Sequence, residues 1–188
     1  MKIGCMPYDS ETPFQEMRAL ALAAEEAGFA SFWLPDHLIH RNGDQDEGMW
    51  EAFTYLSGLA AVTSRITLGP LVACTSFRNP GLLAKIATTL DEVSGGRSIL
   101  GLGAGWHEPE YDAFGYPFDH RVGRFEEAVP VIGPLLRGET VNFTGQYVQM
   151  HNARLLPRGP SPKGPPILIA GRGPRMLRMA ATYADAWN

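Results

Sequence analysis

The sequence predicts an α/β protein in which parallel strands alternate with helices. Short apolar runs bounded by glycine or proline, of which residues 97–102 are the clearest, have the pattern of strands buried on both faces. Longer segments that repeat their apolar side chains at helical spacing separate these runs. Strands that alternate with helices in this way pair in parallel through right-handed crossovers. Both an open doubly wound sheet and a (β/α) barrel satisfy the pattern.

Three strand–helix units are expected in the first half of the chain. They are predicted as a strand over residues 2–6 with a helix over 14–27, a strand over 29–35 with a helix over 50–64, and a strand over 66–73 with a helix over 80–94. Gly28 and Gly95 follow the first and third helices at the position where glycine commonly ends a helix, and Pro80 suits a helix start. Residues 40–48 are predicted as a polar loop.

The second half continues the alternation but contains an interruption. Its predicted elements are a strand over residues 97–102, a helix over 121–136, a small hairpin within 140–156, a strand over 166–170, a helix over 175–184 and the start of a further strand at 186. The segment 157–166 is rich in proline and is expected to be a loop. Residues 140–165 are therefore predicted to be an insertion and linker region between strands four and five.

If the fold is a barrel, the number of predicted strand–helix units is too small to complete it. A full eight-stranded (β/α) barrel takes about 250 residues, whereas this sequence has 188 residues. We expect a single domain over residues 1–188, truncated at its C-terminal end, with a naturally compact variant as the alternative. Truncation would leave apolar strand edges open to association.

Composition and charge restrict the possible partners. The formal net charge is −4, from 16 basic and 20 acidic residues that form no blocks of one sign, which argues against a nucleic-acid partner. The N-terminus lacks the pattern of a signal peptide and no apolar run reaches the length of a membrane span, so we expect a cytoplasmic protein without a membrane partner. Cys5 and Cys74 are expected to be buried thiols rather than a disulfide or a metal site.

Alternating glycines mark the carboxyl end of the fourth strand, in RSILGLGAGW at residues 97–106. Without a Cβ at Gly101, Gly103 and Gly105, a flat ligand could lie against bare backbone. The alternative is that these glycines only make a tight turn from strand to helix. A dinucleotide-binding fingerprint is disfavoured because residues 106–109 separate the glycines from any following helix.

Four segments carry a family resemblance, and they occur in the family's order. They are EEAGFASFWLPDHL at residues 25–38, the stretch RITLGPLVACTSFRNP to GLGAGWHEPEY at 65–111, RFEEAVPVIGPLLRGE at 124–139, and PPILIAGRGPRMLRMAATYADAWN at 165–188. Together they resemble the luciferase-like monooxygenase superfamily, specifically its branch of coenzyme F420-dependent oxidoreductases. The resemblance implies a TIM-type (β/α)8 barrel, here with about five to six strands, a deazaflavin or flavin at the carboxyl ends of the strands, and a homodimer.

The resemblance assigns a catalytic role to His37, which with Asp36 matches the Asp-His pair that follows the second strand in the family. Related F420 enzymes use this histidine beside the reactive ring as an acid or as a polariser of the substrate. A histidine suits proton transfer because its ordinary pKa is near neutrality. The alternative is a histidine held structurally by Asp36 or by a backbone carbonyl. A metal site of Asp36, His37 and His40 is disfavoured because no further ligands are visible, and no metal is expected.

Two groups of residues are implied to bind the cofactor. A bulge with a non-proline cis peptide at Leu71-Val72 is implied behind the ring. The other residues implied to line the ring are Asp36, Cys74, Ala104, Gly105 and Trp106. The residues implied to bind the phosphate are Gly171, Arg172, Gly173, Arg175 and Met176. Backbone N–H groups at a helix start favour anions, although the turn at 171–174 alone would also explain its glycines. His107, Glu108 and Glu110 are nearby polar candidates that the spacing does not position.

The function that follows is an F420-dependent oxidoreductase that transfers a hydride between the deazaflavin and a small organic substrate. Two alternatives remain open: an FMN-dependent monooxygenase, and a non-catalytic fragment that binds flavin weakly or only self-associates. The loop at 41–48 and the aromatic region at 111–119 are expected to shape the substrate pocket, but they do not identify the substrate.

Overall fold

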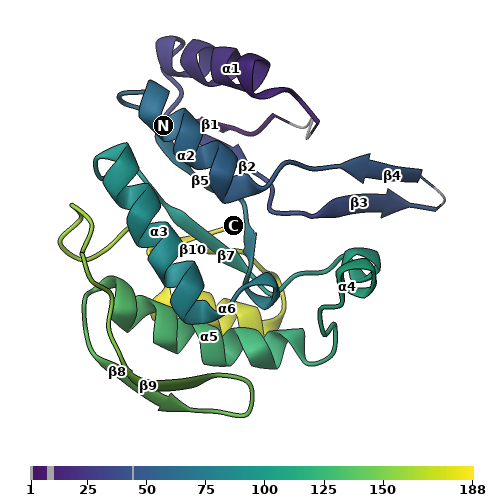
Figure 1. The fold of residues 1–188 in the computed structure, drawn as a ribbon, viewed down its shortest axis with the longest axis vertical. Coiled ribbons are helices and arrows are strands. Elements are labelled where there is room, and N and C mark those ends of the chain that lie inside the picture. The colour runs from purple at the N-terminus through teal and green to yellow at the C-terminus, as the bar shows by residue number, and fades with distance from the viewer. Residues whose placement is uncertain (1, 8–10, 44) are drawn as a thin grey trace.

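The structure is a computed structural model that describes residues 2–7, 11–43 and 45–188 (Figure 1). Its elements, in chain order, are β1 (Gly4–Cys5), α1 (Phe14–Glu26), β2 (Ser31–Leu34), β3 (Ile39–Asn42), β4 (Gln45–Gly48), α2 (Ala52–Val62), β5 (Thr67–Pro70), β6 (Ala73–Cys74), the 3-10 turn η1 (Thr75–Phe77), α3 (Pro80–Ser94), β7 (Leu100–Gly103), α4 (Glu108–Phe114), α5 (Arg121–Leu136), β8 (Val141–Thr144), β9 (Gln149–Ala153), β10 (Ile167–Ile169), α6 (Pro174–Tyr183) and β11 (Ala186–Trp187).

The parallel strands neighbour one another in the order of the chain. β1, β2 and β5 pair in parallel, and so do β6, β7, β10 and β11. A bridge between Leu68 of β5 and Ser98 connects the two sets. A doubly wound sheet reverses its strand order at a switch point, whereas this succession does not reverse. The winding is therefore that of an incomplete (β/α) barrel, as the sequence analysis predicted.

The predicted third strand is divided into β5 and β6 by a cis peptide bond at Leu71-Val72. β5 pairs with β2, and β6 pairs with β7. The break therefore turns the chain from one set of strands to the other. The cis bond lies at the position that the family resemblance implied.

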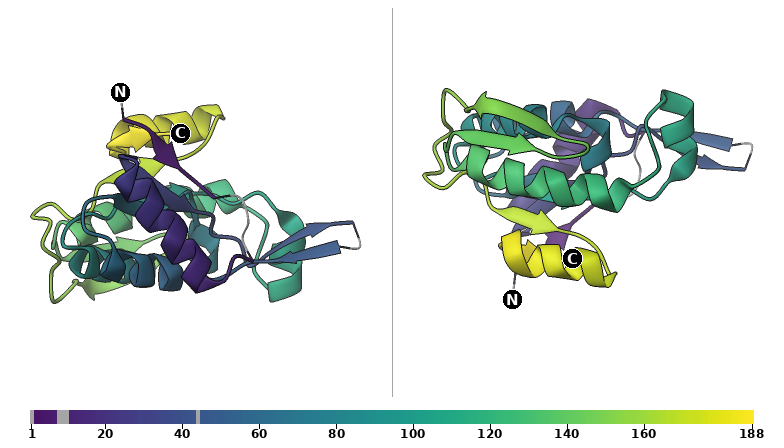
Figure 2. Two further views of the ribbon diagram at one scale, coloured as in Figure 1. Left: turned by 90° about the horizontal axis from the view of Figure 1, so that it is seen from above. Right: turned by 90° about the horizontal axis from the view of Figure 1, so that it is seen from below.

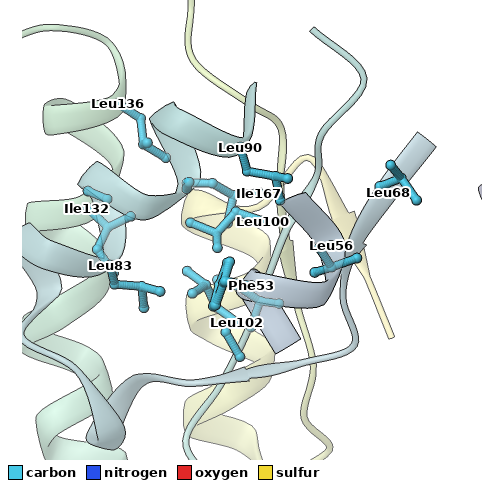
Figure 3. Packing of buried hydrophobic residues seen from close by; sticks show 14 of the residues in the cluster. Phe53, Leu56, Leu68, Leu83, Leu90, Leu100, Leu102, Ile132, Leu136 and Ile167 are labelled. Atoms are coloured by element: carbon cyan, nitrogen blue, oxygen red, sulfur yellow. The ribbon is translucent and has the colours of Figure 1, made fainter. Parts of the chain in front are cut away.

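α1 contacts α2, α2 contacts α3 and α3 contacts α5, so these four helices lie side by side along the strands (Figures 1 and 2). Along β7, Leu100 and Leu102 lie on the same face because side chains alternate across a strand. Both leucines are fully buried, and Figure 3 shows them facing side chains of α3 and α5 such as Leu83 and Ile132. This layer between strands and helices is the main hydrophobic core.

The glycines of β7 make room for the protein's own atoms. A Cβ on Gly101 would lie 2.1 Å from the carbonyl oxygen of Pro70, and a Cβ on Gly103 would lie 2.7 Å from Cγ2 of Val72. Both neighbours belong to the divided third strand. The adjacent strand therefore occupies the space that a Cβ would need at Gly101 and Gly103, and the expectation that a ligand lies against their backbone stays a prediction.

Two segments that the sequence analysis treated as loops contain regular structure. Residues 39–42 and 45–48 form the antiparallel hairpin β3–β4, in which Asn42 pairs with Gln45. Asp44, between the two strands, lies outside the described residues. The other is the stretch between the predicted strand over 97–102 and the predicted helix over 121–136, which contains α4; this helix contacts β3. Figures 1 and 2 show the hairpin extending beyond the rest of the molecule, on the side where α4 lies.

The remaining predicted elements are confirmed. α5 has the predicted bounds although it contains Pro130 and Pro134, and the hairpin β8–β9 lies within the predicted insertion region. Both cysteines are free thiols, but only Cys74 is buried, since Cys5 is half-buried. Within the described residues, none of the helices combines the length and apolar character needed to cross a membrane.

Candidate functional site

A cavity of about 640 Å³ lies where the parallel strands end at their carboxyl termini. Its wall comes from the segments that follow β2, β5, β7 and β10, together with the start of α5 and the last residue of the chain. The lining residues are Asp36, His37, Leu71, Val72, Cys74, Gly103, Ala104, Gly105, Trp106, Glu110, Arg121, Val122, Ala170, Gly171, Arg172, Met176 and Asn188. Ligands of parallel α/β folds bind at this edge of the strands.

Most of the site residues named from the sequence line this cavity, but Gly173 and Arg175 do not. Arg175 is turned away and pairs with Glu126, with Nε 2.8 Å from Oε1, beside a separate hollow at the start of α5. Gly173 is the residue that precedes α6. A carboxylate therefore engages the guanidinium group of Arg175 in this structure, and its contact with a cofactor phosphate stays a prediction.

Glu110, Arg121 and Asn188 line the cavity, although no sequence pattern assigned them to it. Glu110 stood among the polar candidates that could not be positioned, since it belongs to α4, which was not predicted. Arg121 opens α5, and no motif marks it. Predicting α4 from its apolar Tyr111 and Phe114, with Gly115 after them, would have placed Glu110 on a defined helix.

Asp36 is a buried structural anchor. Its two carboxylate oxygens accept hydrogen bonds from Nη1 and Nη2 of Arg78 at 2.7 and 2.9 Å, and the backbone N–H of Cys74 donates to Oδ2 at 2.9 Å. Arg78 also donates to Glu51 at the start of α2 at 2.7 Å. This bidentate pair fixes the segment before His37 against the segment after β6.

His37 is held by Glu110 rather than by Asp36. The Nδ1 atom lies 2.9 Å from Oε1 of Glu110, and the backbone N–H of Leu38 donates to Oε2 of the same carboxylate at 2.9 Å. The side chain of Glu110 is 2% exposed and that of His37 is 21% exposed. Within the described part of the chain, the Nε2 atom of His37 has no hydrogen-bond partner. The histidine therefore lines the cavity with one nitrogen engaged and the other free.

Trp106 and two further histidines surround His37. The Trp106 side chain meets His37 edge to face at a centroid distance of 5.6 Å and is 63% exposed. His107 accepts a hydrogen bond at Nε2 from the backbone N–H of Arg41, at 3.0 Å, and so connects the cavity wall to the hairpin β3–β4. Burial lowers the pKa of His107, which favours the neutral form that can accept this bond.

These side chains do not converge on a metal ion. Across the described ranges, no group of three or more histidine, cysteine or acidic side chains is arranged to hold one. His40 lies with its ring centroid 5.0 Å from that of His107, and the rings of the cluster meet in tilted and edge-to-face arrangements.

Cys74 and Tyr111 form a hydrogen-bonded pair behind Gly105. Sγ of Cys74 lies 2.9 Å from Oη of Tyr111, which donates to the carbonyl of Ala104 at 3.1 Å. Burial raises the pKa of the Cys74 thiol to about 11, and burial also raises the pKa of Tyr111. Both groups are therefore neutral near pH 7, so the thiol is not a nucleophile and serves as part of the wall.

Two cationic side chains, those of Arg121 and Arg172, also line the cavity. Nε of Arg121 donates to the carbonyl of Gly105 at 3.1 Å, and its guanidinium group lies over the ring of Phe118. Arg172 belongs to the turn that leads into α6, whose first residue is Pro174. The cavity therefore combines an apolar wall at Leu71 and Val72 with positive charge and a helix N-terminus, an arrangement that suits a flat ring with an anionic tail.

Comparison with known proteins places the whole chain in one family. The sequence model described as luciferase-like monooxygenase matches residues 1–188. A 5,10-methylenetetrahydromethanopterin reductase from Archaeoglobus fulgidus is 32% identical over 185 residues, which cover 98% of this chain and 52% of the relative.

Solved structures give the same result. The coenzyme F420-dependent tetrahydromethanopterin reductase from Methanopyrus kandleri has a TM-score of 0.82 at 26% identity, covering 100% of this chain and 54% of its own. A monooxygenase from Streptomyces bottropensis has a TM-score of 0.86 at 29% identity, covering 96% of this chain and 57% of its own. The chain thus spans about half the length of the relatives it matches.

Proposed function

Because the chain belongs to the luciferase-like monooxygenase family, we propose that its cavity binds coenzyme F420 and supports hydride transfer between that cofactor and a small organic substrate. The similar reductases from Archaeoglobus fulgidus and Methanopyrus kandleri support this class of reaction. The cavity volume of about 640 Å³ lies in the range of cofactor and small-molecule sites.

The residues around the cavity fit the parts of such a cofactor. Leu71 and Val72 supply an apolar surface for a ring, and Trp106 supplies an exposed aromatic face. Arg172 and the N-terminus of α6 supply positive charge for a phosphate. When bound, the deazaflavin supplies the redox chemistry, while the protein supplies orientation and a proton.

The observation that carries the proposal is the position of His37. Its ring lines the cavity, and its Nε2 atom has no hydrogen-bond partner among the described residues. We assign it the proton transfer that must accompany hydride transfer to or from a carbon–oxygen bond. An imidazole performs this near neutral pH because its ordinary pKa is about 6.5.

We also propose the domain organisation, the cellular location and the partners of the protein. We infer a single domain over residues 1–188 with an insertion at 140–165, acting in the cytoplasm as a homodimer on a small molecule, without a nucleic-acid or membrane partner. The hairpin β8–β9 between β7 and β10 supports the insertion. The free thiols support a reducing compartment.

An FMN-dependent monooxygenase is the second candidate. The similarity to the monooxygenase from Streptomyces bottropensis favours it, at a TM-score of 0.86. The two candidates differ in the cofactor that the cavity accepts, so a binding measurement separates them.

The test is a titration of F420 and, separately, FMN into the purified chain, followed by fluorescence, with His37→Gln as the variant. We expect F420 to bind more tightly than FMN and the variant to bind it within about two-fold. With reduced F420 and a panel of small ketones, we expect turnover to fall about 100-fold in the variant, as for loss of a general acid. Preference for FMN would move the assignment to the monooxygenases. Absence of binding to either would favour a non-catalytic fragment.

A further inference from the structure

We propose that Glu110 is a positioning residue that fixes the tautomer and orientation of His37, so that Nε2 is the atom that exchanges the proton with the substrate. This inference rests on the proposed function for its catalytic consequence. Its structural content, the tautomer of His37, holds or fails independently of any cofactor.

The carboxylate of Glu110 holds the histidine segment at two points. One oxygen lies 2.9 Å from Nδ1 of His37, and the other accepts the backbone N–H of Leu38 at 2.9 Å. Contact with both the ring and the adjacent backbone restricts rotation of the ring as well as its position. Because Glu110 is 2% exposed, water competes little for either oxygen.

An ionised carboxylate only accepts hydrogen bonds, and this determines which nitrogen carries the proton. In the neutral imidazole one nitrogen is a donor and the other an acceptor. With Nδ1 facing Glu110, the proton lies on Nδ1 and the lone pair lies on Nε2. In water the neutral side chain prefers the opposite form, so the contact with Glu110 reverses the intrinsic preference.

The resulting step conserves atoms and charge. A ketone that accepts a hydride gains a C–H bond at its carbonyl carbon, its π electron pair moves to oxygen, and that oxygen takes the proton from Nε2 of protonated His37. Reduced F420, if bound, would supply the hydride and be oxidised. The histidine returns to its neutral Nδ1–H form, still bound to Glu110. Oxidation of the alcohol follows the same path in reverse.

The neighbouring groups do not offer an equivalent contact. Both oxygens of Asp36 are engaged by Arg78, and Nε2 of His107 accepts from the backbone of Arg41. Glu110 is itself held in place, because Tyr111, the next residue of α4, is fully buried and hydrogen-bonded to Cys74. The orienting carboxylate is thus fixed by packing on its own helix.

The first test is the ¹⁵N spectrum of histidine-labelled protein at a pH where the rings are neutral, without cofactor. We expect His37, assigned by the loss of its signals in His37→Gln, to show protonated Nδ1 and unprotonated Nε2. In Glu110→Gln the ring should shift toward the Nε2–H form. Glu110→Asp should retain part of the original signature, because it keeps the charge. Glu108→Gln, an exposed neighbour on the same helix, should change nothing.

The second test is the rate with the ketone panel. We expect Glu110→Gln to lower kcat about 10-fold to 100-fold, as second-sphere partners of histidine do, with KM changed less than about two-fold. Glu110→Asp should recover part of the rate, and Glu108→Gln should behave like the parent. An Nε2–H tautomer in the parent protein overturns the proposal, and so does a Glu110→Gln variant with unchanged tautomer and rate. A parent that is inactive but shows the Nδ1–H form refutes the proposed function alone.

Discussion

Gly105 illustrates how a single residue is constrained by its surroundings at the site. Its φ is +80°, and a Cβ at this position would lie 1.8 Å from Oη of Tyr111. Gly28 offers a matched control, with a φ of +82° and no atom within 4 Å of a Cβ. The two positions therefore separate the cost of the backbone conformation from the cost of the collision.

We expect Gly28→Ala to lower the free energy of unfolding by about 1–2 kcal/mol, the cost of a left-handed conformation. Gly105→Ala should lower it by about 1–3 kcal/mol more, since Tyr111 must leave its hydrogen bonds to Cys74 and Ala104. Urea denaturation of the two variants measures the difference. Equal losses in both would contradict the proposed collision.

At the level of elements, Glu25 connects the end of α1 to the segment between α2 and β5. Its carboxylate accepts hydrogen bonds from the backbone N–H groups of Ser64, Arg65 and Ile66. Burial by itself raises the pKa of Glu25, but these hydrogen bonds outweigh it and lower the pKa from 4.5 to about 2. The ionised form is thus stabilised in the folded state relative to the unfolded state.

The lowered pKa of Glu25 determines how the free energy of unfolding changes with pH. Because the folded pKa is depressed, the contribution of Glu25 is complete above about pH 4.5 and is lost as the pH falls toward about 2. We expect Glu25→Gln to lower the free energy of unfolding at pH 7 by about 1.5–3 kcal/mol, the range for hydrogen bonds to charged groups. The difference from the parent should shrink below pH 4.

Urea denaturation between pH 7 and pH 3 tests this expectation, with the adjacent exposed Glu26→Gln as the control. The free energy of unfolding of that variant should stay within about 0.5 kcal/mol of the parent's value. A loss in Glu25→Gln that is the same at every pH would show that the carboxylate charge is not responsible.

At the level of the whole molecule, the cavity joins both sets of strands. His37 follows β2, Gly103 ends β7, and Arg172 follows β10. A ligand that contacts all three should stabilise the folded chain as one unit. At 100 times its dissociation constant, F420 should raise the free energy of unfolding by about 2.7 kcal/mol.

Hydrogen exchange measures where this stabilisation acts. We expect the amides of β2 and β10 to gain protection together when F420 is added. Arg172→Gln should weaken the effect at both strands by reducing affinity. Protection confined to one of them would contradict a site shared between the two sets.

The candidate site could be predicted only in part. His37, Trp106 and Gly171 were assigned through the family resemblance and line the cavity, whereas Arg175 pairs with Glu126 outside it. Glu110 could not be assigned, because its contact with His37 crosses 73 residues of sequence. The position of an isolated carboxylate depends on how a short helix packs, and no local pattern encodes that packing.

By itself, the sequence determined the alternation of strands and helices, the helix ends at Gly28 and Gly95, and the family. These features depend on periodicity and on end signals, which are local. Only the tertiary structure decided what Gly101 and Gly103 accommodate and which acid holds His37. Those outcomes depend on the neighbouring strand and on α4, which approach from distant parts of the chain, and long-range packing decides the geometry of such contacts.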